Sequence, residues 1–599
     1  MPTPAGWSTP KRLLPPVVEE NLPVWMNRAV LLRLLLASAW IIPGGAGAIA
    51  SPSTAAERPN VIFIIADDLG WGDVGCYGNS DLDTPVLNRL AADGVRLTDC
   101  YAPSPLCSPA RAGFLTGRWN HRTGAVDVSS NRGVDRIDLS ERTIGDHFHA
   151  AGYATAYVGK WHSGLYCDDY LPHRRGFDRF VGFANGAHDF WQWQLERRTA
   201  ARDGQAETTR VEAADGRHLS EVLAAEAIDF VRESAAADRP FVVVYAAAAI
   251  HPPLQAAEPL IEKYARRLGD RGDRAVAITY AMIEQLDTGI GRLLGAVATA
   301  GMREQTLVIF TSDNGANLRW SGLPGQTGER FHGPFRGNKG DVLEQGIRVP
   351  GIVAWPGTIP AGRVIETPVH GCDWLPTMLD ACGLEPVVDS KPLDGVSLLP
   401  LLADGVAGDL ADRPLCFQKT RYTPVAHSNA AIRQGRWKLV WPPIPETMRK
   451  DTARDNISYH RGLTQPHWEM PLDPGLPDYA GVRAVAAQLF DLTTDPGEAR
   501  DVAADHPAVT ARLAAAYDRW FAEVFREWQA ARTCIVEHDH ALWRDRRPPD
   551  PRTLFKGEWL WNQVRDADPS TSDPLKVFRG FWSAEGREPM EPSERSQSL

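Results

Sequence analysis

Four short runs along the chain are almost wholly apolar and rich in β-branched residues, and polar residues follow each of them. They are Asn60–Ala66, Ala154–Val158, Phe241–Tyr245 and Leu307–Thr311. Runs of this length, without a polar residue at every second position, are typical of strands that are buried on both faces of a parallel sheet. The pattern therefore predicts four buried strands, of which Ala154–Val158 is the weakest.

Segments with helical periodicity separate these strands, namely Pro85–Gly94, Leu219–Ser234 and Ala275–Ala300. Strands that alternate with helices indicate an α/β domain, which we assign to residues 59–415. At 599 residues the chain is too long for one ordinary core, so we expect about two domains plus extensions.

The pattern changes after the α/β segment. Ala430–Val440 is typical of a β-hairpin, Gln488–Leu492 of a further strand, and Ala508–Glu527 of an amphipathic helix. Together they predict a smaller antiparallel sheet-and-helix domain over residues 416–527.

Both ends of the chain are predicted to lie outside these domains. Ala29–Ile42 is apolar apart from one arginine, is too short for a comfortable membrane span, and precedes small residues. Residues 1–50 are therefore predicted to be an N-terminal extension with a signal peptide, with Met26 as a candidate start and an uncleaved anchor as the alternative. Residues 51–58 are a predicted linker, and residues 528–599 are a C-terminal extension without an assigned structure. We expect export to the periplasm or the extracellular space, without stable membrane insertion.

The residues that follow the four strands are of kinds that bind metals and anions. In chain order they are Asp67-Asp68, Lys160 with His162, His251, and Asp313-Asn314. Because ligand sites gather outside the carboxyl ends of parallel strands, we expect one shared site. Taken singly, the paired aspartates also fit a helix N-cap with a solvated neighbour, and Asp313-Asn314 fits a turn.

Asp67, Asp68, Asp313 and Asn314 offer hard oxygen donors, with no histidine or cysteine among them by motif. Such a set suits Ca²⁺ or, as a second choice, Mg²⁺ rather than zinc or copper. Ca²⁺ takes about six to eight oxygens, which leaves room for further ligands.

The run Cys107-Ser108-Pro109-Ala110-Arg111 is the most specific motif in the chain. It follows a loop-like segment, Tyr101–Leu106, and precedes a helical-looking run, Ala112–Arg118. A lone C-x-P-x-R run occurs by chance in many proteins, and a free cysteine is most often a small buried hydrophobe. In the company of the strand-end residues, however, the run resembles the modification signature of the formylglycine-dependent sulfatases.

Lys339 lies between Gly337 and Gly340 in the segment Pro334–Pro350. A lysine between glycines is commonly a solvated turn residue. Its position after the Asp-Asn pair favours a role in the site, and the segment resembles one in which a sulfatase lysine contacts the sulfate.

These motifs in this order resemble a formylglycine-dependent sulfatase of the arylsulfatase type, within the alkaline phosphatase superfamily. The resemblance runs from about Pro59 to about Pro350, and continues more weakly to Glu498. It implies a large mixed, mostly parallel sheet sandwiched by helices, followed by the smaller C-terminal domain.

The resemblance also implies the chemistry. A formylglycine-generating enzyme would oxidise Cys107 to 3-oxoalanine (formylglycine), whose hydrate is both nucleophile and metal ligand beside the four oxygen donors. One hydroxyl of the diol attacks sulfur and expels the alcohol. The second hydroxyl then collapses to the aldehyde and releases sulfate.

The remaining residues take supporting roles by the same resemblance. Arg111 steadies the diol, while Lys160 and Lys339 neutralise sulfate oxygens. His162 is the base for the closing step, and His251 contacts the sulfate and the departing oxygen. Asn338 stands where the family commonly has glycine, which would alter the turn beside the lysine.

The composition is that of a globular protein, with 43% hydrophobic and 23% charged residues. A formal net charge of −11 argues against a nucleic-acid partner. The eight cysteines are too few for a disulfide scaffold. Cys372 and Cys382, ten residues apart, are either a disulfide pair or two buried thiols.

We expect a sulfated small molecule or glycan as the substrate, with a carbohydrate or an aryl alcohol as the leaving group. Trp191 and Trp193 either stack on a sugar ring or pack within the protein, and packing is favoured. Three other functions stay open: a formylglycine-dependent phosphonate monoester or phosphodiester hydrolase, a catalytically silent protein that binds sulfated ligands, and a phosphotransferase that uses Ser108. The last would need zinc-binding histidines that are not evident.

Overall fold

The structure is a computed structural model that describes residues 58–165, 167–201, 208–319, 323, 325–326, 328–450, 475–479 and 481–543. By its internal contacts the chain divides into Met1–Ala56 and Glu57–Leu599, and all described residues belong to the second unit. The predicted signal peptide, the predicted linker up to residue 57, and the chain after Trp543 lie outside the described residues.

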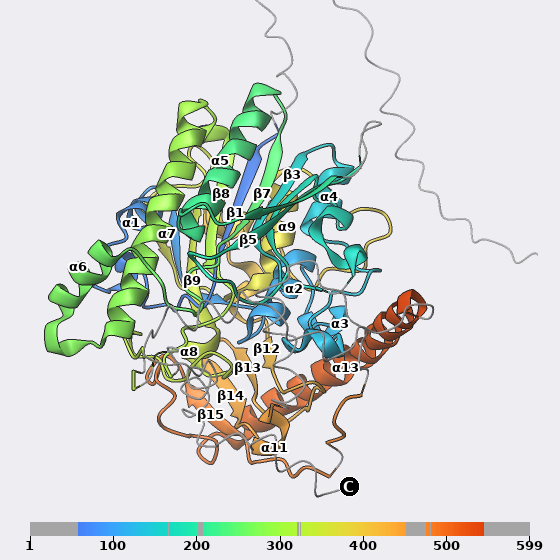
Figure 1. Ribbon diagram of the computed structural model, residues 1–599. Helices are drawn as coiled ribbons and strands as arrows, with labels where there is room; N and C mark the ends of the chain where they lie inside the picture. The colour runs from blue at the N-terminus through green and yellow to red at the C-terminus, as the bar shows by residue number, and fades with distance from the viewer. Residues whose placement is uncertain are drawn as a thin grey trace, which may run out of the picture. The chain divides into compact units, whose positions relative to one another are not determined.

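A sheet of eleven strands forms the centre of the fold (Figure 1). Ten strands lie in the spatial order β10 (Arg363–Ile365), β2 (Val95–Tyr101), β9 (Arg348–Ala354), β8 (Thr306–Ser312), β1 (Asn60–Ala66), β7 (Phe241–Ala246), β3 (Ala154–Lys160), β4 (Arg179–Phe183), β5 (Gln194–Thr199) and β6 (Thr208–Ala213). The eleventh, β11 (Val369–His370), pairs with β2. Among the described strands, six pairings in this sheet are parallel and four are antiparallel. The predicted mixed, mostly parallel sheet is confirmed.

The four strands predicted from apolar runs lie side by side in the order β8, β1, β7, β3. All three pairings between them are parallel, and Ile64 of β1 lies opposite Tyr245 of β7 and Phe310 of β8. Every residue of these strands is buried. Their carboxyl ends therefore meet at one edge of the sheet.

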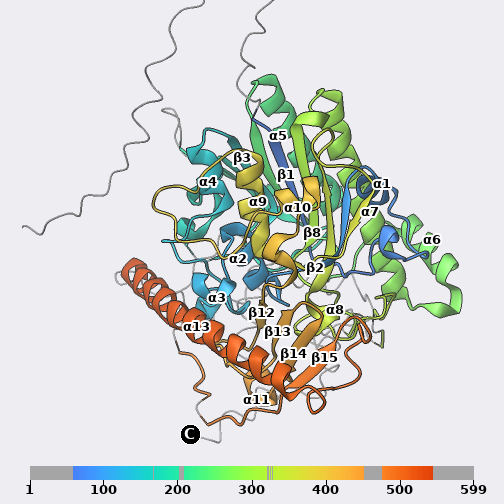
Figure 2. The ribbon, with the colours of Figure 1, turned by 180° about the vertical axis from the view of Figure 1, so that it is seen from behind.

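Helices cover both faces of the sheet, because alternate side chains of β1 enter two separate cores. Ile62 and Ile64 belong to one core and Phe63 to the other. The first core is built with α1 (Pro85–Ala92), α5 (Leu219–Ala236), α6 (Glu258–Leu268) and α7 (Arg274–Thr299). The second is built with α2 (Cys107–Thr116), α4 (Ile144–Ala150), α9 (Trp374–Ala381) and α10 (Leu399–Asp404), on the side that faces the viewer in Figure 2. The predicted sandwich is confirmed, and the three predicted helices end within two residues of α1, α5 and α7.

Short helical segments complete this part of the fold. The short α-helices are α3 (Asn120–Thr123), α8 (Glu344–Ile347) and α11 (Pro445–Met448). The 3-10 helices are η1 (Gly75–Tyr77), η2 (Ser130–Arg132), η3 (Asp168–Tyr170), η4 (Pro172–Arg174), η5 (Gly269–Arg271), η6 (Arg303–Gln305), η7 (Gly371–Asp373) and η8 (Gly408–Ala411).

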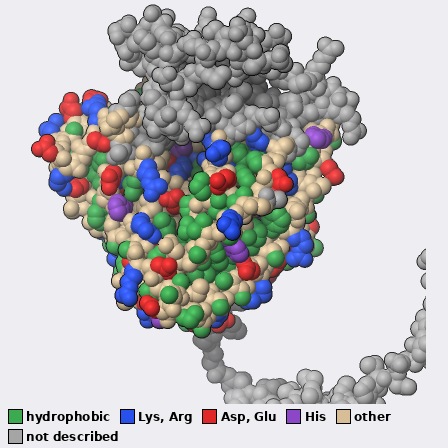
Figure 3. Space-filling view, turned by 90° about the horizontal axis from the view of Figure 1, so that it is seen from below, with side chains coloured by type: hydrophobic (Ala, Val, Ile, Leu, Met, Phe, Trp, Pro, Cys, Tyr) green, Lys and Arg blue, Asp and Glu red, His purple; other side chains and the backbone are tan. Residues whose placement is uncertain are grey.

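The smaller antiparallel sheet has the order β12 (Leu415–Gln418), β13 (Ala430–Gln434), β14 (Trp437–Trp441) and β15 (Gln488–Asp491). One face packs against Tyr101 and Ile347 of the large domain. The other packs against Leu513 and Tyr517 of α13 (Pro507–Trp543). Seen from below relative to Figure 1, the surface has acidic and basic side chains interspersed around exposed apolar ones (Figure 3). The predicted hairpin and sheet-and-helix architecture are confirmed.

Helix α13 is longer than predicted, since within the described residues it continues past Glu527 to Trp543. Its second half packs on the large domain: Trp528 joins Val126 and Val134 in a small core, and Glu527 pairs with two buried arginines of the α2–α3 region. The predicted boundary at residues 527 and 528 thus falls inside a helix that spans both domains. Contacts with residues far away in the sequence accompany its continuation past Glu527.

All eight cysteines are free thiols in the structure. The Cys372 thiol donates to the Arg118 carbonyl at 3.2 Å, and the Cys382 thiol to the Pro59 carbonyl at 3.7 Å. Of the two alternatives for this pair, the structure has buried thiols. Every helix in the described part of the chain falls short of the length and apolarity needed to cross a bilayer.

Candidate active site

The ends of β1 and β8 bring the predicted metal-binding residues together. Asp67 and Asp68 follow β1, and Asp313 and Asn314 follow β8, which is its parallel neighbour. The Asp313 amide donates to the Ala66 carbonyl at 3.0 Å, so the pairing continues past the strands. All four side chains are at most 2% exposed. The ends of the two strands thereby bring three carboxylates and one amide into one buried cluster.

Three oxygens of this cluster are buried without a hydrogen-bond donor in the described residues: Asp67 Oδ1, Asp68 Oδ2 and Asn314 Oδ1. The Asn314 amide nitrogen donates to Asp68 Oδ1 at 2.8 Å, which leaves its oxygen free. Unpartnered buried oxygens are costly unless a cation accepts their lone pairs. The cluster fits a hard divalent cation, because three of its four residues each supply one such oxygen.

Arg111 holds the fourth member of the cluster. Its Nε and Nη2 donate to Asp313 Oδ2 at 3.0 and 2.8 Å, and its Nη1 donates to the Lys160 carbonyl at 2.7 Å. Burial alone would lower the pKa of Arg111, but Asp313 more than offsets this and the guanidinium stays charged. Arg111 therefore links the α2 motif to the ends of β8 and β3.

Two lysines neutralise the other carboxylates. Lys160 Nζ lies 2.7 Å from Asp67 Oδ2, and Lys339 Nζ lies 2.6 Å from Asp68 Oδ1. Burial would raise the pKa of Asp68, yet Lys339 and then His251 hold it well below its ordinary value. Three carboxylates face three cations, so a divalent metal would give the cluster a net charge of about +2, which attracts an anionic substrate.

Cys107 is the first residue of α2, so the helix begins at the motif rather than at Ala112 as predicted. Proline at position 109 is compatible with this, because the first turn of a helix needs no amide donor there. Cys107 is 3% exposed and lies within electrostatic reach of Arg111 and Lys339. The Gly340 amide donates to the Pro105 carbonyl at 2.8 Å, which ties the turn after Lys339 to the segment before Cys107. The sequence motif and the lysine turn meet at one place.

Ser108 does not share this arrangement. Its hydroxyl donates to the Asp135 carbonyl at 2.9 Å, and the side chain is fully buried. The hydroxyl is therefore engaged in a structural hydrogen bond, which weakens the phosphotransferase alternative.

His162 adopts a left-handed backbone (φ 51°), as does Asp68 (φ 62°). Such conformations are unfavourable for residues with a side chain and cluster at functional sites. A Cβ on Gly186 would lie 2.5 Å from the His162 ring, so glycine at that position makes room for the imidazole. Burial, followed by the charge of Lys160, holds the pKa of His162 well below its ordinary value. The ring is neutral at neutral pH and can accept a proton.

His251 lies closer to the carboxylates than the sequence indicated. One of its ring nitrogens and carboxylate oxygens of Asp67 and Asp68 all lie within 4.8 Å of one another. Its Nδ1 donates to the Pro252 carbonyl at 2.7 Å, and burial, followed by Lys339, lowers its pKa. The second ring nitrogen of the neutral tautomer is left with a lone pair.

Lys419 is a further cation that sequence reasoning did not single out. It follows β12 of the small sheet, is 3% exposed, and its ammonium forms no hydrogen bond or ion pair with the described residues. Its electrostatic neighbours include Arg421, Asp127, Asp341 and Cys107. Burial first, and Arg421 second, lower its pKa to about 7. The residues around Lys419 form no recognisable motif, so the sequence alone does not point to this lysine.

Hydrogen bonds from one asparagine side chain hold the Lys419 backbone beside the Lys339 turn. The Asn429 side chain donates both to the Lys419 carbonyl at 2.8 Å and to the Gly340 carbonyl at 2.7 Å. Asn429 thus joins the small sheet to the Lys339 turn. The small domain contributes a charged side chain to the site as well as covering the sheet.

The tryptophans of the aromatic loop behave differently from each other. Trp193 is 2% exposed, packs in the first core and donates from its ring to the Arg217 carbonyl at 2.9 Å. Trp191 is half-buried and lies edge-on to the His218 ring. The packing interpretation is therefore correct for Trp193.

Chelating divalent metal is expected to abolish turnover without unfolding the protein. Because Lys160, Lys339 and Arg111 neutralise the carboxylates, the metal-free cluster holds no uncompensated charge. We expect EGTA to lower sulfate-ester hydrolysis by about 100-fold or more, with a cooperative melting transition a few degrees lower, and Ca²⁺ to restore activity better than Mg²⁺. Full activity after chelation, or loss of the cooperative transition, would contradict this.

Comparison with known proteins identifies the family. The sulfatase family model matches residues 59–384. The chain is 34% identical over 499 residues to N-acetylgalactosamine-6-sulfatase of Canis lupus familiaris, a match that covers 78% of this chain and 84% of that protein. It is 32% identical over 475 residues to arylsulfatase A of Homo sapiens, covering 75% and 84%.

Solved structures agree in fold. The crystal structure of Ps i-CgsB in complex with k-i-k-neocarrahexaose superimposes with a TM-score of 0.62 at 24% identity, covering 83% of this chain and 100% of that chain. The phosphonate monoester hydrolase of Agrobacterium radiobacter superimposes with a TM-score of 0.51 at 21% identity, covering 79% and 96%. Because the family model spans more than half of the chain and the relatives match three quarters of it, the chain belongs to the sulfatase family and is a sulfuric ester hydrolase.

Proposed function

We propose that this sulfatase hydrolyses a sulfate monoester of a carbohydrate, with a formylglycine made from Cys107 as nucleophile and Ca²⁺ as metal. The observation that carries the proposal is that Lys339 and Lys419 both lie within electrostatic reach of Cys107. Lys339 also faces the carboxylate cluster, in which three buried oxygens have no partner among the described residues. A thiol among anion-binding groups and a hard-metal site has no structural purpose there. It suits a residue that is modified before use.

The two absent groups would supply distinct chemistry. The hydrated aldehyde at position 107 would provide one hydroxyl to attack sulfur and a second to release sulfate. Ca²⁺ held by Asp67, Asp68, Asp313 and Asn314 would polarise the ester and favour deprotonation nearby.

The side chains of this chain would then perform the proton and charge work. Lys160 and Lys339, now paired with carboxylates, become available to sulfate oxygens when a cation takes over that charge. His162, neutral and without a partner on Nδ1, accepts the proton in the closing step. His251 or Lys339 serves the departing oxygen. Arg111 keeps Asp313 and the Lys160 segment in place.

The names of the similar proteins support a sugar as the leaving group. One acts on an N-acetylgalactosamine 6-sulfate, and another is solved with a carrageenan-type oligosaccharide. The similarity to human arylsulfatase A supports activity on aryl sulfates as well. A panel of sulfated monosaccharides, beside an aryl sulfate, is the direct test of the substrate class. Absence of sulfate release from every sugar would exclude it.

The runner-up is a phosphonate monoester or phosphodiester hydrolase, which the likeness to a phosphonate monoester hydrolase favours. Hydrolysis of an aryl sulfate should exceed that of the matching aryl phosphonate if the proposal holds. The reverse order would establish the runner-up. Peptide mass spectrometry of the segment with Cys107 decides between an aldehyde and a thiol, and a thiol without turnover would indicate a silent binding protein.

We also propose that the protein is exported and matured by a formylglycine-generating enzyme. The apolar segment Ala29–Ile42 supports export through a cleaved signal peptide. N-terminal sequencing of the mature protein tests this, and an N-terminus before residue 29 would contradict it.

Replacing Lys419 by methionine is expected to raise KM for the sulfate ester by about tenfold or more, because a charged hydrogen bond contributes about 1.5–3 kcal/mol. Since the ammonium form binds the anion and its pKa is about 7, KM of the unaltered enzyme should rise as pH increases above 7. Lys419→Arg, which stays charged, should lack this rise.

Lys391 provides the matched control, because its ammonium is paired with Glu141 and 37% exposed. Lys391→Met should leave KM and its pH profile unchanged. Equal KM values for Lys419→Met and the unaltered enzyme across this pH range would show that Lys419 does not touch the substrate.

A further inference from the structure

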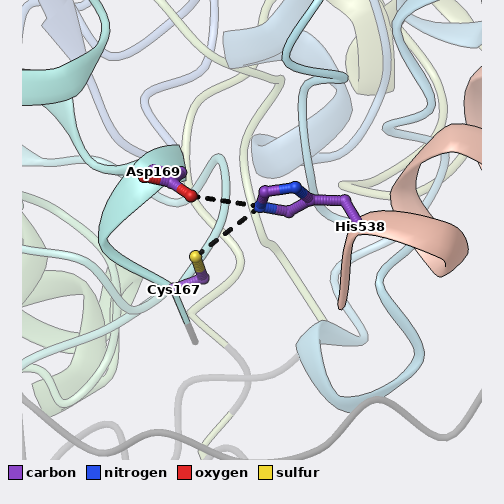
Figure 4. A group of neighbouring side chains, drawn as sticks. All are labelled: Cys167, Asp169 and His538. Atoms are coloured by element: carbon purple, nitrogen blue, oxygen red, sulfur yellow. Dashed lines mark hydrogen bonds and ion pairs between the residues drawn. The ribbon is translucent and has the colours of Figure 1, made fainter. Parts of the chain in front are cut away.

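A second group of metal-binding side chains lies outside the active site. Cys167 and Asp169 belong to the segment around η3, and His538 belongs to α13. His538 Nε2 lies 3.2 Å from Asp169 Oδ2 and 3.9 Å from Cys167 Sγ. In Figure 4 both contacts meet at the same ring nitrogen. The three ligand atoms all lie within 4.8 Å of one another.

This convergence is poorly served by protons alone. A carboxylate and a thiol sulfur both face one imidazole nitrogen, and that nitrogen carries at most one proton. If the ring nitrogen directs its proton at Asp169, it cannot accept the hydrogen of the Cys167 thiol. If the ring nitrogen carries no proton, the thiol can donate to it, but the Asp169 carboxylate then faces a lone pair. A cation between the three atoms satisfies all of them together.

The separations match a zinc tetrahedron. With Zn–N near 2.05 Å, Zn–O near 2.1 Å and Zn–S near 2.3 Å, tetrahedral edges are about 3.4 Å for N to O and about 3.6 Å for S to N. The observed 3.2 and 3.9 Å are within a few tenths of an ångström of these values. Thiolate and imidazole ligands select zinc rather than Ca²⁺ or Mg²⁺.

The surrounding residues hold the group in place. Asp539, the next residue along α13, is 1% exposed, pairs with the buried Arg136, and accepts a hydrogen bond from the Tyr170 hydroxyl at 3.3 Å. The Tyr170 ring lies edge-on to the His538 ring with centroids 5.6 Å apart. These contacts already bring the two sides of the site together, so an ion there would strengthen an existing contact, and His538 remains 29% exposed and open to ions from solvent.

We propose that Cys167, Asp169 and His538 bind Zn²⁺, with water as the fourth ligand, and that this ion fastens the end of α13 to the large domain. The ligands come from opposite sides of that contact, so the ion links elements more than 360 residues apart in the sequence. Three protein ligands plus water complete the usual coordination of zinc. The proposal is independent of the sulfatase chemistry.

The parent for this test is the full-length protein with Cys107→Ser, which removes the thiol of the active site. Metals are first removed by dialysis against a chelator. Zinc binding is measured by titration, zinc content after desalting by elemental analysis, and the thiolate by the near-ultraviolet charge-transfer band of added Co²⁺. The variants are His538→Ala and Cys167→Ser. Cys534→Ser, an exposed thiol on the same helix, is the matched control.

We expect the parent and Cys534→Ser to bind about one zinc that both variants bind at least about tenfold more weakly. The Co²⁺ band should be present in the parent and absent in Cys167→Ser, and Zn²⁺ should raise the melting temperature only where the site is intact. Equal zinc affinity in all four proteins, no zinc binding to the parent, or loss of the band in Cys534→Ser would each overturn the proposal. Cys167→Ser changes one atom, so its result stands even if His538→Ala folds poorly.

Discussion

Cys107→Ser is expected to lower sulfate-ester turnover by about 10⁴-fold or more, the size of effect seen when an enzyme loses its nucleophile. Serine has one hydroxyl, so it can accept the sulfuryl group but has no second hydroxyl whose collapse would release it. The substitution is nearly isosteric at a position that is 3% exposed. We therefore expect a folded, inactive protein that accumulates a sulfated serine.

Two measurements check this expectation. Steady-state hydrolysis of an aryl sulfate gives the loss of turnover, and intact mass after incubation with substrate shows the covalent adduct. Cys76→Ser, at a half-buried thiol of η1, should keep full turnover and form no adduct. Turnover by Cys107→Ser close to that of the unaltered enzyme would refute the assigned nucleophile.

Arg111→Met is expected to lower both activity and stability. The guanidinium is fully buried and makes three hydrogen bonds, two to Asp313 and one to the Lys160 carbonyl. Its removal leaves the buried Asp313 carboxylate without its cationic partner, with only the Asp68 amide as a donor, and leaves the Lys160 carbonyl with the Tyr157 hydroxyl alone. Breaking a buried ion pair in this way costs about 3–5 kcal/mol. We expect a clear drop in the urea midpoint and at least about 100-fold slower hydrolysis.

Arg89→Met is the control for the loss of an arginine. That side chain is 75% exposed and pairs with Asp93 one helical turn away, an arrangement that contributes little in water. Its urea midpoint and turnover should be unchanged. If Arg111→Met unfolds at the same urea concentration as the unaltered protein, the buried pair is not what holds the ends of β8 and β3 together.

The strands could be predicted because their signal is local. Every side chain of a strand in the middle of a sheet is buried, so an apolar run such as Asn60–Ala66 is itself the evidence. The site residues could be predicted for a related reason. Once β1 and β8 are parallel neighbours, Asp67-Asp68 and Asp313-Asn314 have to meet at the edge where both strands end.

Helix α2 begins earlier than predicted, and helix α13 continues further than predicted. The helical-looking run was predicted from Ala112, but α2 begins at Cys107, and the first turn of a helix accepts the proline of the motif. The amphipathic helix was predicted to Glu527 and the residues after it were left unassigned, but the helix continues, and Trp528 and Asp539 find partners on the large domain. Neither end is decided by the residues of the helix alone.

The amino-acid sequence by itself determined the four central strands, three of the helices that cover them, and the residues that we propose as nucleophile and metal ligands, since each is written in residues that are neighbours along the chain. Only the tertiary structure decided that Lys419 lies beside the Lys339 turn and that Cys167 and His538 face each other. Those side chains owe their surroundings to contacts between distant segments, and burial and charge are properties of the assembled fold rather than of a motif.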